Sequence, residues 1–495
     1  MKEAKEEANG QGMIEEDRYK RQTLLWGKGG QAKLANSRVA VVGLGPQGVY
    51  TALCMAALGV GNIVLVDGSE TETGEMFLDM PLPTGLKARS YPELLGKINA
   101  QINIEGYPVT LESKIDQVAL AGANVIVDAT NSVRSKELAI LYGKEKNIPV
   151  LSVSSKSGYT KLVFCDPKEN NPEYLMPMFS SQEQDPLMAL SMCGVTAEEV
   201  RKIIFGEIQN IIRNPVRYVL GEGYRFGFPK NGKEAPRPDK TLYENLSAAF
   251  LGGGALGCWG AIAGAMMGFG RLDVYDYDKF EPHNINRQVL AYDGIDKLKA
   301  GHIAKKISKM SRGKTKSTGH NMLILPGFDP KTKYDVVFDF VDNRYTRAIN
   351  SAYAVSHGIP LISAGALPAS ARWDTHVAGK TKCMGCLYNI YEEGRKEEMI
   401  RRASCAENPN PSVVMSNAVA GINALLDAFT VFEPEKFGEP FNGEQTYRST
   451  SPKRFGTSPL KGPCDCYSKP VPNLEVSQED IEKFITENPG VLKGA

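Results

Sequence analysis

A group of acidic, basic and amide side chains between residues 276 and 347 has the composition expected around a nucleoside triphosphate. A lysine and an arginine would neutralise phosphates as charge moves onto a leaving pyrophosphate, while one aspartate holds magnesium and another binds ribose hydroxyls. A nicotinamide enzyme needs one acid for the ribose and a neutral place for hydride transfer, so this density of charge favours nucleotidyl transfer from ATP. The group consists of Asp276, Asp278, Asn284, Arg287, Gln288, Lys299, Asp342, Asn343 and Arg347.

The segment directly before these residues predicts the element that positions them. The stretch 246–270 carries no charge and is long enough to span a bilayer, but three consecutive glycines would open a membrane helix near its middle. We therefore interpret LSAAFL as a buried strand, Gly252-x-Gly254-x-x-Gly257 as a tight turn, and CWGAIAGAMMGFG as a helix lying close to a sheet. RLDVYDYD then predicts a second strand, ending in the two aspartates. This βαβ unit predicts a nucleotide site at the carboxyl edge of a parallel sheet.

The same pattern occurs earlier in the chain. The run 37–67 predicts a strand, a glycine turn, an apolar helix and a strand, and four of its markers each lie 209 residues before a counterpart. Apolar runs at 123–130 and 334–342 extend both copies by a further buried strand. A repeat held in register at four positions indicates two copies of one domain. The matched pairs are Gly43 and Gly252, Gly45 and Gly254, Gly48 and Gly257, and Asp67 and Asp276.

Composition shifts along the chain predict its division into domains. An apolar helical run at 412–432 is expected to lie in the core of the second copy, and the prolines and charges before that copy predict a linker. The expected segments are a disordered lead-in at 1–17, a first domain at 18–227 with a helical insertion at about 165–225, a linker at 228–242, a second domain at 243–466, and a tail at 467–495 with a short amphipathic helix.

The strings GGGALG, YDYDKFEPHNINRQ, KLKA and DNRYTR resemble those of the ubiquitin-activating enzymes and their bacterial relatives ThiF and MoeB. The resemblance covers about 19–155 and 243–432 and is more specific in the second span. It implies an α/β fold of two tandem Rossmann-like adenylation domains of the ThiF/MoeB type, which form a pseudo-dimer within one chain that could itself be monomeric.

That resemblance also implies a reaction and a role for each site residue. The terminal carboxylate of a ubiquitin-like or sulfur-carrier protein ending in Gly-Gly attacks the α-phosphate of ATP, giving an acyl adenylate and pyrophosphate. The glycine-turn amides cradle phosphate at the start of a helix. The roles are Asp276 for the ribose, Asn284, Arg287 and Lys299 for the phosphates, Gln288 for the adenylate site, Asp342 for magnesium, and Asp278 and Asn343 for the nucleotide, beside the glycines Gly252, Gly254 and Gly257.

The first copy shows a degraded version of this pattern. It keeps the glycine turn and Asp67, but the following GSETETGEMFLDMP has no Asn-x-x-Arg-Gln, and Asn131 falls where the second copy has Asp342. We expect no catalysis from this copy alone. It opens with RYKRQ, which resembles the start of the inactive subunit of eukaryotic activating enzymes, and this implies that Arg21 reaches across the pseudo-twofold as an arginine finger. The alternative for Arg21 is a solvated first helical turn.

Four cysteines have spacings that suggest a tetrahedral zinc site of the kind found in MoeB-type proteins. The second pair is one residue tighter than the usual spacing, and the alternative is a set of reduced, metal-free thiols. The four are Cys383, Cys386, Cys464 and Cys466.

A further cysteine, Cys405, lies just before the predicted 412–432 helix. Relatives that continue beyond adenylation place a transfer cysteine there, so Cys405 is the candidate for accepting the acyl group as a thioester or for sulfur transfer. Arg401 and Arg402 and the helix terminus would lower its pKa. The alternative is a small buried residue.

The overall composition excludes several kinds of partner. The 495 residues contain 58 Lys and Arg against 57 Asp and Glu, so no global basic field favours nucleic acid or an anionic membrane. The N-terminus has neither a signal core nor a transit-peptide composition, and we expect a cytoplasmic protein. The expected cofactors are ATP, magnesium and zinc, and the expected further partners are a conjugating enzyme or a sulfurtransferase.

The sequence thus predicts an ATP-dependent activating enzyme for a ubiquitin-like or sulfur-carrier protein. Its product would be a thioester, a thiocarboxylate or the adenylate alone. One rival is adenylation of a peptide or of a tRNA base, although the lack of a basic patch disfavours the tRNA. The other rival is a non-catalytic scaffold that binds nucleotide or a ubiquitin-like partner.

Overall fold

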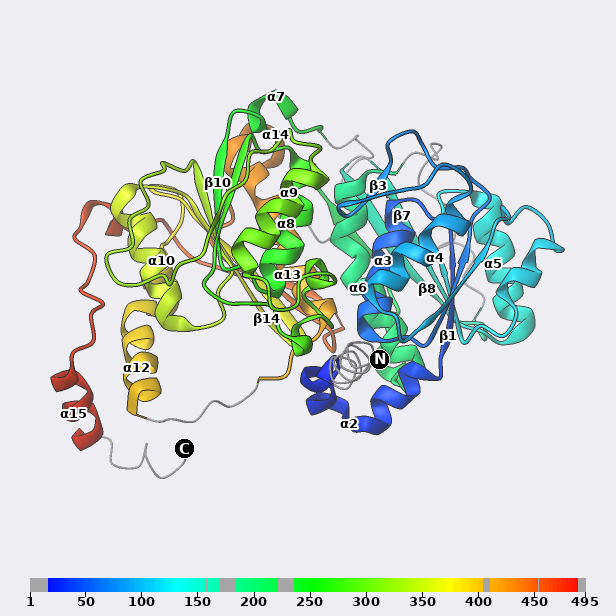
Figure 1. Cartoon of the computed structure of the whole chain (residues 1–495), viewed down its shortest axis with the longest axis horizontal. Helices are drawn as coiled ribbons and strands as arrows, with labels where there is room; N and C mark the ends of the chain where they lie inside the picture. The colour runs from blue at the N-terminus through cyan, green and yellow to red at the C-terminus, as the bar shows by residue number, and fades with distance from the viewer. Residues whose placement is uncertain are drawn as a thin grey trace, which may run out of the picture.

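A computed structural model describes residues 17–156, 158–169, 184–220, 236–403, 410–452 and 454–487. It contains two α/β halves that lie side by side in Figure 1, the first in blue and cyan and the second in green to orange. Each half is built on one mixed sheet, of seven and eight strands respectively. This confirms the predicted fold of two Rossmann-like domains in tandem.

The first half has the strand order β5-β2-β1-β6-β7-β8-β9, parallel from β5 to β7 and antiparallel beyond. Its strands are β1 (Arg38–Val42), β2 (Asn62–Val66), β5 (Asn103–Tyr107), β6 (Val125–Asp128), β7 (Val150–Lys156), β8 (Tyr159–Cys165) and β9 (Val216–Val219), with a hairpin of β3 (Met76–Phe77) and β4 (Met80–Pro81). Its helices are α2 (Lys20–Ala35), α3 (Pro46–Leu58), α4 (Lys87–Ile98), α5 (Val133–Lys146) and α6 (Pro186–Phe205), with short turns η1 (Asp116–Leu120) and η3 (Ile208–Asn210).

The second half has the order β12-β11-β10-β13-β14-β15-β16-β17, parallel from β12 to β14 and antiparallel beyond. Its strands are β10 (Ser247–Leu251), β11 (Arg271–Tyr275), β12 (Gly319–His320), β13 (Val336–Asp339), β14 (Leu361–Leu367), β15 (Ser370–His376), β16 (Gly443–Arg448) and β17 (Phe455–Pro459). Its helices are α7 (Lys240–Tyr243), α8 (Ala255–Met267), α9 (Lys299–Met310), α10 (Arg344–His357), α11 (Met384–Tyr388), α12 (Ile390–Ala403), α13 (Val414–Phe432), α14 (Pro434–Phe437) and α15 (Gln478–Glu487), with η4 (Pro282–Asn284), η5 (Val289–Ala291) and η6 (Cys466–Ser468).

The internal repeat holds element by element. Strand β1, helix α3 and strand β2 recur as β10, α8 and β11 with the same lengths and a constant offset of 209 residues. From β6 to β8 the counterparts are β13 to β15, each shifted by 211 residues. In both sheets the chain adds strands first on one side of the first strand, β1 or β10, and then on the other side. The crevice at this switch point is where doubly wound sheets bind ligands.

One buried polar network recurs in both halves beneath this crevice. In each, a cation on the helix after β6 or β13 donates to an aspartate on that strand and to a serine on the next strand, β7 or β14. The contacts are Lys136 Nζ to Asp128 Oδ2 at 2.6 Å and to Ser152 Oγ at 3.1 Å, and Arg347 Nη1 to Asp339 Oδ2 at 2.7 Å and to Ser363 Oγ at 2.7 Å. Because all six residues are buried, the network ties helix to sheet rather than holding a ligand.

Helices α6 and α13 join the two halves. Each packs on its own sheet and glycine-turn helix, α6 on α3, β7 and β8, and α13 on α8, β14 and β15, and the two helices pack on each other. At Gly194 in α6 a Cβ atom would lie 2.6 Å from the Met415 carbonyl oxygen of α13, so only glycine permits this approach. Residues of both halves therefore form one continuous hydrophobic core.

Helix α13 also meets the length and composition of a membrane span, but 94% of its apolar window is buried inside the protein. It is the core helix predicted at 412–432. The predicted insertion at about 165–225 contains α6, which is the counterpart of α13 in the first half.

Parts of the expected lead-in and linker, at 1–16 and 228–235, lie outside the described residues. In the tail, α15 packs on α12 through buried Ile481 and Phe484.

Candidate active site

The glycine turn of the second half lies between β10 and α8. Gly252 has a φ of 112°, and a Cβ atom there would lie 2.8 Å from the Phe340 backbone. A Cβ on Gly257 would lie 2.3 Å from the Gly252 oxygen, whereas one on Gly254 would meet nothing within 4 Å. The turn is thus tight on its inner side and open at Gly254, where a phosphate would approach the N-terminus of α8.

The two aspartates after β11 lie against this turn. Asp276 accepts hydrogen bonds from the amides of Gly253 at 2.7 Å and Asp278 at 2.8 Å. Burial raises the pKa of Asp276, with Lys299 and the two amides acting in the opposite direction. A carboxylate fixed in this way at the end of the second strand is placed to accept from ribose hydroxyls.

Lys299, the first residue of α9, contacts the same acids. Its Nζ lies 2.9 Å from Asp278 Oδ2, and its side chain is 9% exposed. Burial by itself would lower the pKa of Lys299, but Asp276 and Asp278 outweigh it and the pKa lies above its ordinary value. Lys299 is therefore charged and is available to a phosphate.

The loop after β11 carries the amide and arginine side chains. Asn284 forms a capping box with Glu281 in η4, which fixes the loop. Arg287 Nη1 donates to the His283 carbonyl at 2.6 Å and to Asn286 Oδ1 at 2.9 Å. Burial, followed by repulsion from Arg21, lowers the pKa of Arg287 to about 10. A buried guanidinium with only neutral hydrogen-bond partners among the described residues is a site that favours an anion.

Gln288, next to this arginine, is buried, and its Oε1 atom has no hydrogen-bond partner among the described residues. An unsatisfied buried amide oxygen at this position could accept a hydrogen bond from a bound group.

Arg21 comes from α2 of the first half. Its Nη2 lies 3.5 Å from His283 Nε2, and its Nη1 donates to the Asn410 carbonyl at 3.5 Å. Burial and then Arg21 hold the pKa of His283 below its ordinary value, so the neutral imidazole can accept from the guanidinium. The neighbouring Gln22 is buried and its Oε1 accepts from Asn286 Nδ2 at 2.9 Å. The structure thus brings Arg21 next to the loop that carries Arg287.

Asp342 and Asn343 lie at the carboxyl end of β13, and both are exposed. Among the described residues, no hydrogen bond or ion pair holds the Asp342 carboxylate, so it could meet a metal ion at the crevice. The Asn343 side chain already accepts from the Thr346 amide at 2.8 Å as the N-cap of α10. At this edge of the sheet, Asn343 therefore has a structural contact as the cap of α10.

The same place in the first half is filled by the chain itself. Asp67 holds the turn as Asp276 does, accepting from the Leu44 amide at 2.5 Å. A Cβ on Gly45, the counterpart of Gly254, would lie 2.6 Å from Gln184 Oε1. That oxygen accepts from the Gln47 amide at 3.1 Å, while Gln184 Nε2 donates to the Ala129 carbonyl at 2.7 Å. Gln184 thus takes the hydrogen bond that a phosphate would take in the second half.

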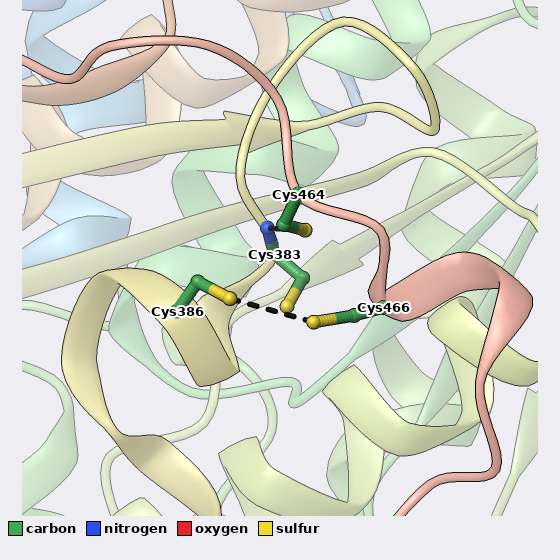
Figure 2. A group of neighbouring side chains, drawn as sticks. All are labelled: Cys383, Cys386, Cys464 and Cys466. Carbon is green, nitrogen blue, oxygen red and sulfur yellow. Dashed lines mark hydrogen bonds between the residues drawn. The ribbon is translucent and has the colours of Figure 1, made fainter.

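Four thiols form a separate cluster at the far end of the second sheet. Figure 2 shows them converging from the start of α11 and from the segment that enters η6. Their sulfur atoms all lie within 4.8 Å of one another. A tetrahedral zinc ion with Zn–S bonds of about 2.3 Å separates its sulfurs by less than this, so the set fits a closed structural site. The four are Cys383, Cys386, Cys464 and Cys466.

Cys405 lies outside the described residues. Arg401 and Arg402, at the end of α12, both pair with Glu398, at 2.7 Å in each case. Their charge is therefore already partly neutralised.

Sequence spacing predicted the acids and cations of the second half as site residues, but it did not single out two residues that contact this loop. His283 contacts both Arg21 and Arg287. Gln22 follows Arg21 in the sequence and bonds Asn286. The only available signal was their adjacency to Arg21 and Asn284.

Comparison with known proteins agrees with both halves of this description. A model of the ThiF family matches residues 19–218 and 233–455. The adenylyltransferase and sulfurtransferase UBA4 of Saccharomyces cerevisiae (strain YJM789) is 35% identical over 147 residues, which are 28% of this chain and 33% of that protein. Adenylyltransferase and sulfurtransferase MOCS3-1 of Zea mays is 27% identical over 247 residues, 49% of this chain and 50% of that protein.

Among solved structures, E. coli MccB with ATP aligns with a TM-score of 0.39 and 22% identity, covering 46% of this chain and 66% of that chain. The chain spans between a third and half of the length of the two curated relatives. The family match covers most of the chain and includes both glycine turns. The chain therefore belongs to the ThiF family.

Proposed function

We propose that this chain uses ATP and magnesium to adenylate the C-terminal carboxylate of a small carrier protein of the ubiquitin-like or sulfur-carrier kind. One observation carries the proposal: Asp276 and Lys299 lie at an open glycine turn in the second half, and Arg21 of the first half reaches the loop that carries Arg287. Use of ATP is a property of the ThiF family, and the names of UBA4 and MOCS3-1 both include adenylyltransferase.

The proposed reaction is one displacement at phosphorus. A carboxylate oxygen of the carrier attacks the α-phosphorus, an acyl–oxygen–phosphorus bond forms, and the bond to the β-phosphate breaks to release pyrophosphate. Asp276 would hold the ribose, and Lys299 and Arg287 would hold the phosphates. Arg21 would neutralise charge that develops on the leaving pyrophosphate.

Asp342 would hold the magnesium ion. Its exposed carboxylate at the end of β13 is the kind of oxygen ligand that magnesium accepts beside substrate phosphates. Bound there, magnesium would supply positive charge to balance the phosphates.

The proposal is tested by pyrophosphate exchange into ATP with a panel of candidate carriers ending in Gly-Gly. Exchange is expected with at least one carrier and should fall by about a thousandfold in Asp342→Ala. Asp329→Ala, an exposed acid of the same half, is the control and should keep full exchange. Exchange that survives Asp342→Ala would overturn the site assignment. ATP binding without exchange for any carrier would favour a scaffold.

We further propose that Cys405 receives the activated acyl group as a thioester or takes part in sulfur transfer, because sulfurtransferase also appears in the names of the two relatives. The thiolate would attack the acyl carbon and AMP would leave. A reducible conjugate of enzyme and carrier should appear on a non-reducing gel and vanish in Cys405→Ala while exchange persists. A conjugate that persists in that variant would contradict this step.

A further inference from the structure

We propose that Asp79, in the first half, is a positioning residue for the candidate active site in the second half. Asp79 lies at the tip of the β3–β4 hairpin, where Leu78 has a φ of 53°. Its Oδ1 accepts from the Tyr292 hydroxyl at 2.8 Å and lies 2.8 Å from Lys306 Nζ. The two charged side chains are only 4% and 3% exposed. Figure 1 shows the hairpin on the side of the first half that faces α9.

The proposed phosphate-binding side chains lie on the loop before Tyr292 and at the start of helix α9. The contacts of Asp79 hold both this loop and this helix. Tyr292 follows Arg287 and Gln288 after the single turn η5. Lys306 lies on α9 two turns beyond Lys299, on the same face of the helix, because seven residues make about two turns. One carboxylate from the first half thus ties the loop that ends at Arg287 to the helix that begins at Lys299.

The surrounding network makes this attachment rigid. Lys306 Nζ also lies 2.8 Å from Asp293 Oδ1 and 3.7 Å from the centroid of the Tyr292 ring. His302 on α9 lies 3.1 Å from the same Asp293 oxygen and 3.2 Å from the Leu290 carbonyl. Loop and helix are therefore joined by a buried cation held between two acids. Removing one acid from such a cluster leaves a buried charge with too little compensation.

The described part of the first half shows no equivalent arrangement. Helices α4 and α9 have the same length and the same place after the second strand, and the counterpart of Lys306 in α4 is Leu94. Leu94 is buried in the hydrophobic core. Among the described residues, the polar attachment is therefore found where the hairpin meets the half with an open glycine turn.

Asp79→Asn in the full chain tests the proposal, with Glu72→Gln, an exposed acid in the neighbouring β2–β3 loop, as the matched control. We expect the dissociation constant for magnesium–ATP to rise about tenfold in Asp79→Asn and to stay unchanged in Glu72→Gln. Amide hydrogen exchange should accelerate in 286–303 and remain unchanged in β1 and β2. ATP affinity equal to that of the wild type in a folded Asp79→Asn variant would overturn the proposal.

Two further variants separate positioning from general destabilisation. Tyr292→Phe keeps the ring over Lys306 and removes only one bond to Asp79, so it should raise the dissociation constant while the melting temperature stays constant. The double variant Asp79→Asn with Lys306→Met removes both charges. Its loss of free energy of ATP binding should not exceed the sum of the losses in the two single variants. The effect of Asp79 on catalysis rests on the proposed function. ATP binding and amide hydrogen exchange can be measured whether or not the chain catalyses pyrophosphate exchange. A wild-type chain that binds ATP without pyrophosphate exchange would contradict the proposed function and still allow Asp79 to be judged.

Discussion

At the scale of single residues, two of the cations at the site, Arg21 and Arg287, have neutral hydrogen-bond partners. Arg21 and Arg287 both contact His283 and, in the described part of the chain, neither forms an ion pair with an acid. Burying cations without a counter-charge costs free energy, and a bound polyanion would remove that cost. The two arginines come from different halves, so the polyanion would be bound between the two copies.

Arg21→Ala should therefore reduce pyrophosphate exchange far more than it reduces ATP binding. An arginine that stabilises charge only as the reaction proceeds is worth roughly a thousandfold in kcat. Lys20→Ala is the matched control, since Lys20 is the adjacent cation, 68% exposed and paired with Asp17. Steady-state exchange kinetics give kcat and KM for each variant. Equal losses in the two variants would indicate a general charge effect.

Asp276 predicts how ATP binding depends on pH. Burial raises its pKa, so the ionised form lowers the stability of the folded protein at neutral pH, and this penalty disappears as pH falls through the folded pKa. Ribose binding requires the ionised form, so ATP affinity should fall on acidification at a pH above the ordinary aspartate range. Asp276→Asn should bind weakly at all pH values and lack this transition. Calorimetric titrations at several pH values provide the measurement, and the same transition in the variant would contradict the assignment.

The place of a site residue was easiest to predict where it follows directly after a strand. Asp276 and Asp342 follow parallel strands, which end at one edge of the sheet, so their placement at that edge needed no tertiary information. The contacts of Gln22 and His283 depend on how the first half meets the second, and spacing along the chain does not encode that. The role of Asn343 was hard to predict for another reason. An asparagine just before a helix fits both a helix cap and a ligand-binding amide, and the structure shows the cap contact.

At the scale of elements, two glycine turns with one geometry have different occupants. The turn before α8 is open at Gly254, and the turn before α3 is closed by Gln184. The repeat was predictable because glycines and apolar strands keep their register in both copies. The role of Gln184 was not, because it reaches the turn from a distant segment before α6.

A matched pair of substitutions tests which turn binds nucleotide. In Gly254→Ala the new methyl group meets nothing in the protein but projects into the place of a phosphate, so ATP affinity should fall at least about tenfold without loss of stability. In Gly45→Ala the methyl group would displace Gln184, and ATP affinity should stay unchanged. Calorimetry should give one nucleotide per chain for the wild type. A stoichiometry of two, or an effect of Gly45→Ala alone, would contradict the assignment.

At the scale of the whole molecule, the second half is closed at its far end by the thiol cluster. The cysteines join α11 to the segment that runs to α15, and that segment is bonded to α12 through Arg395, which donates to the Asn473 and Glu475 carbonyls at 2.9 and 2.7 Å. A metal ion at the cluster would therefore fix the C-terminal segment to the sheet.

Removal of that metal should loosen the end of the molecule. We expect one zinc ion per chain by elemental analysis, and its loss in Cys386→Ser should lower the melting temperature by about 5 °C or more. Cys386 is exposed, so the substitution itself disturbs little packing. Cys405→Ala should retain the metal. Full stability in a chelated, zinc-free chain would show that the thiols act without a metal.

The buried network of cation, aspartate and serine occurs in both halves, although only one half has an open nucleotide turn. The network ties helix to sheet in both halves, so its occurrence in both reflects a shared structural role and the common origin of the two domains. It implies that the chain arose by duplication and fusion of a gene whose product paired with itself through the helix now represented by α6 and α13.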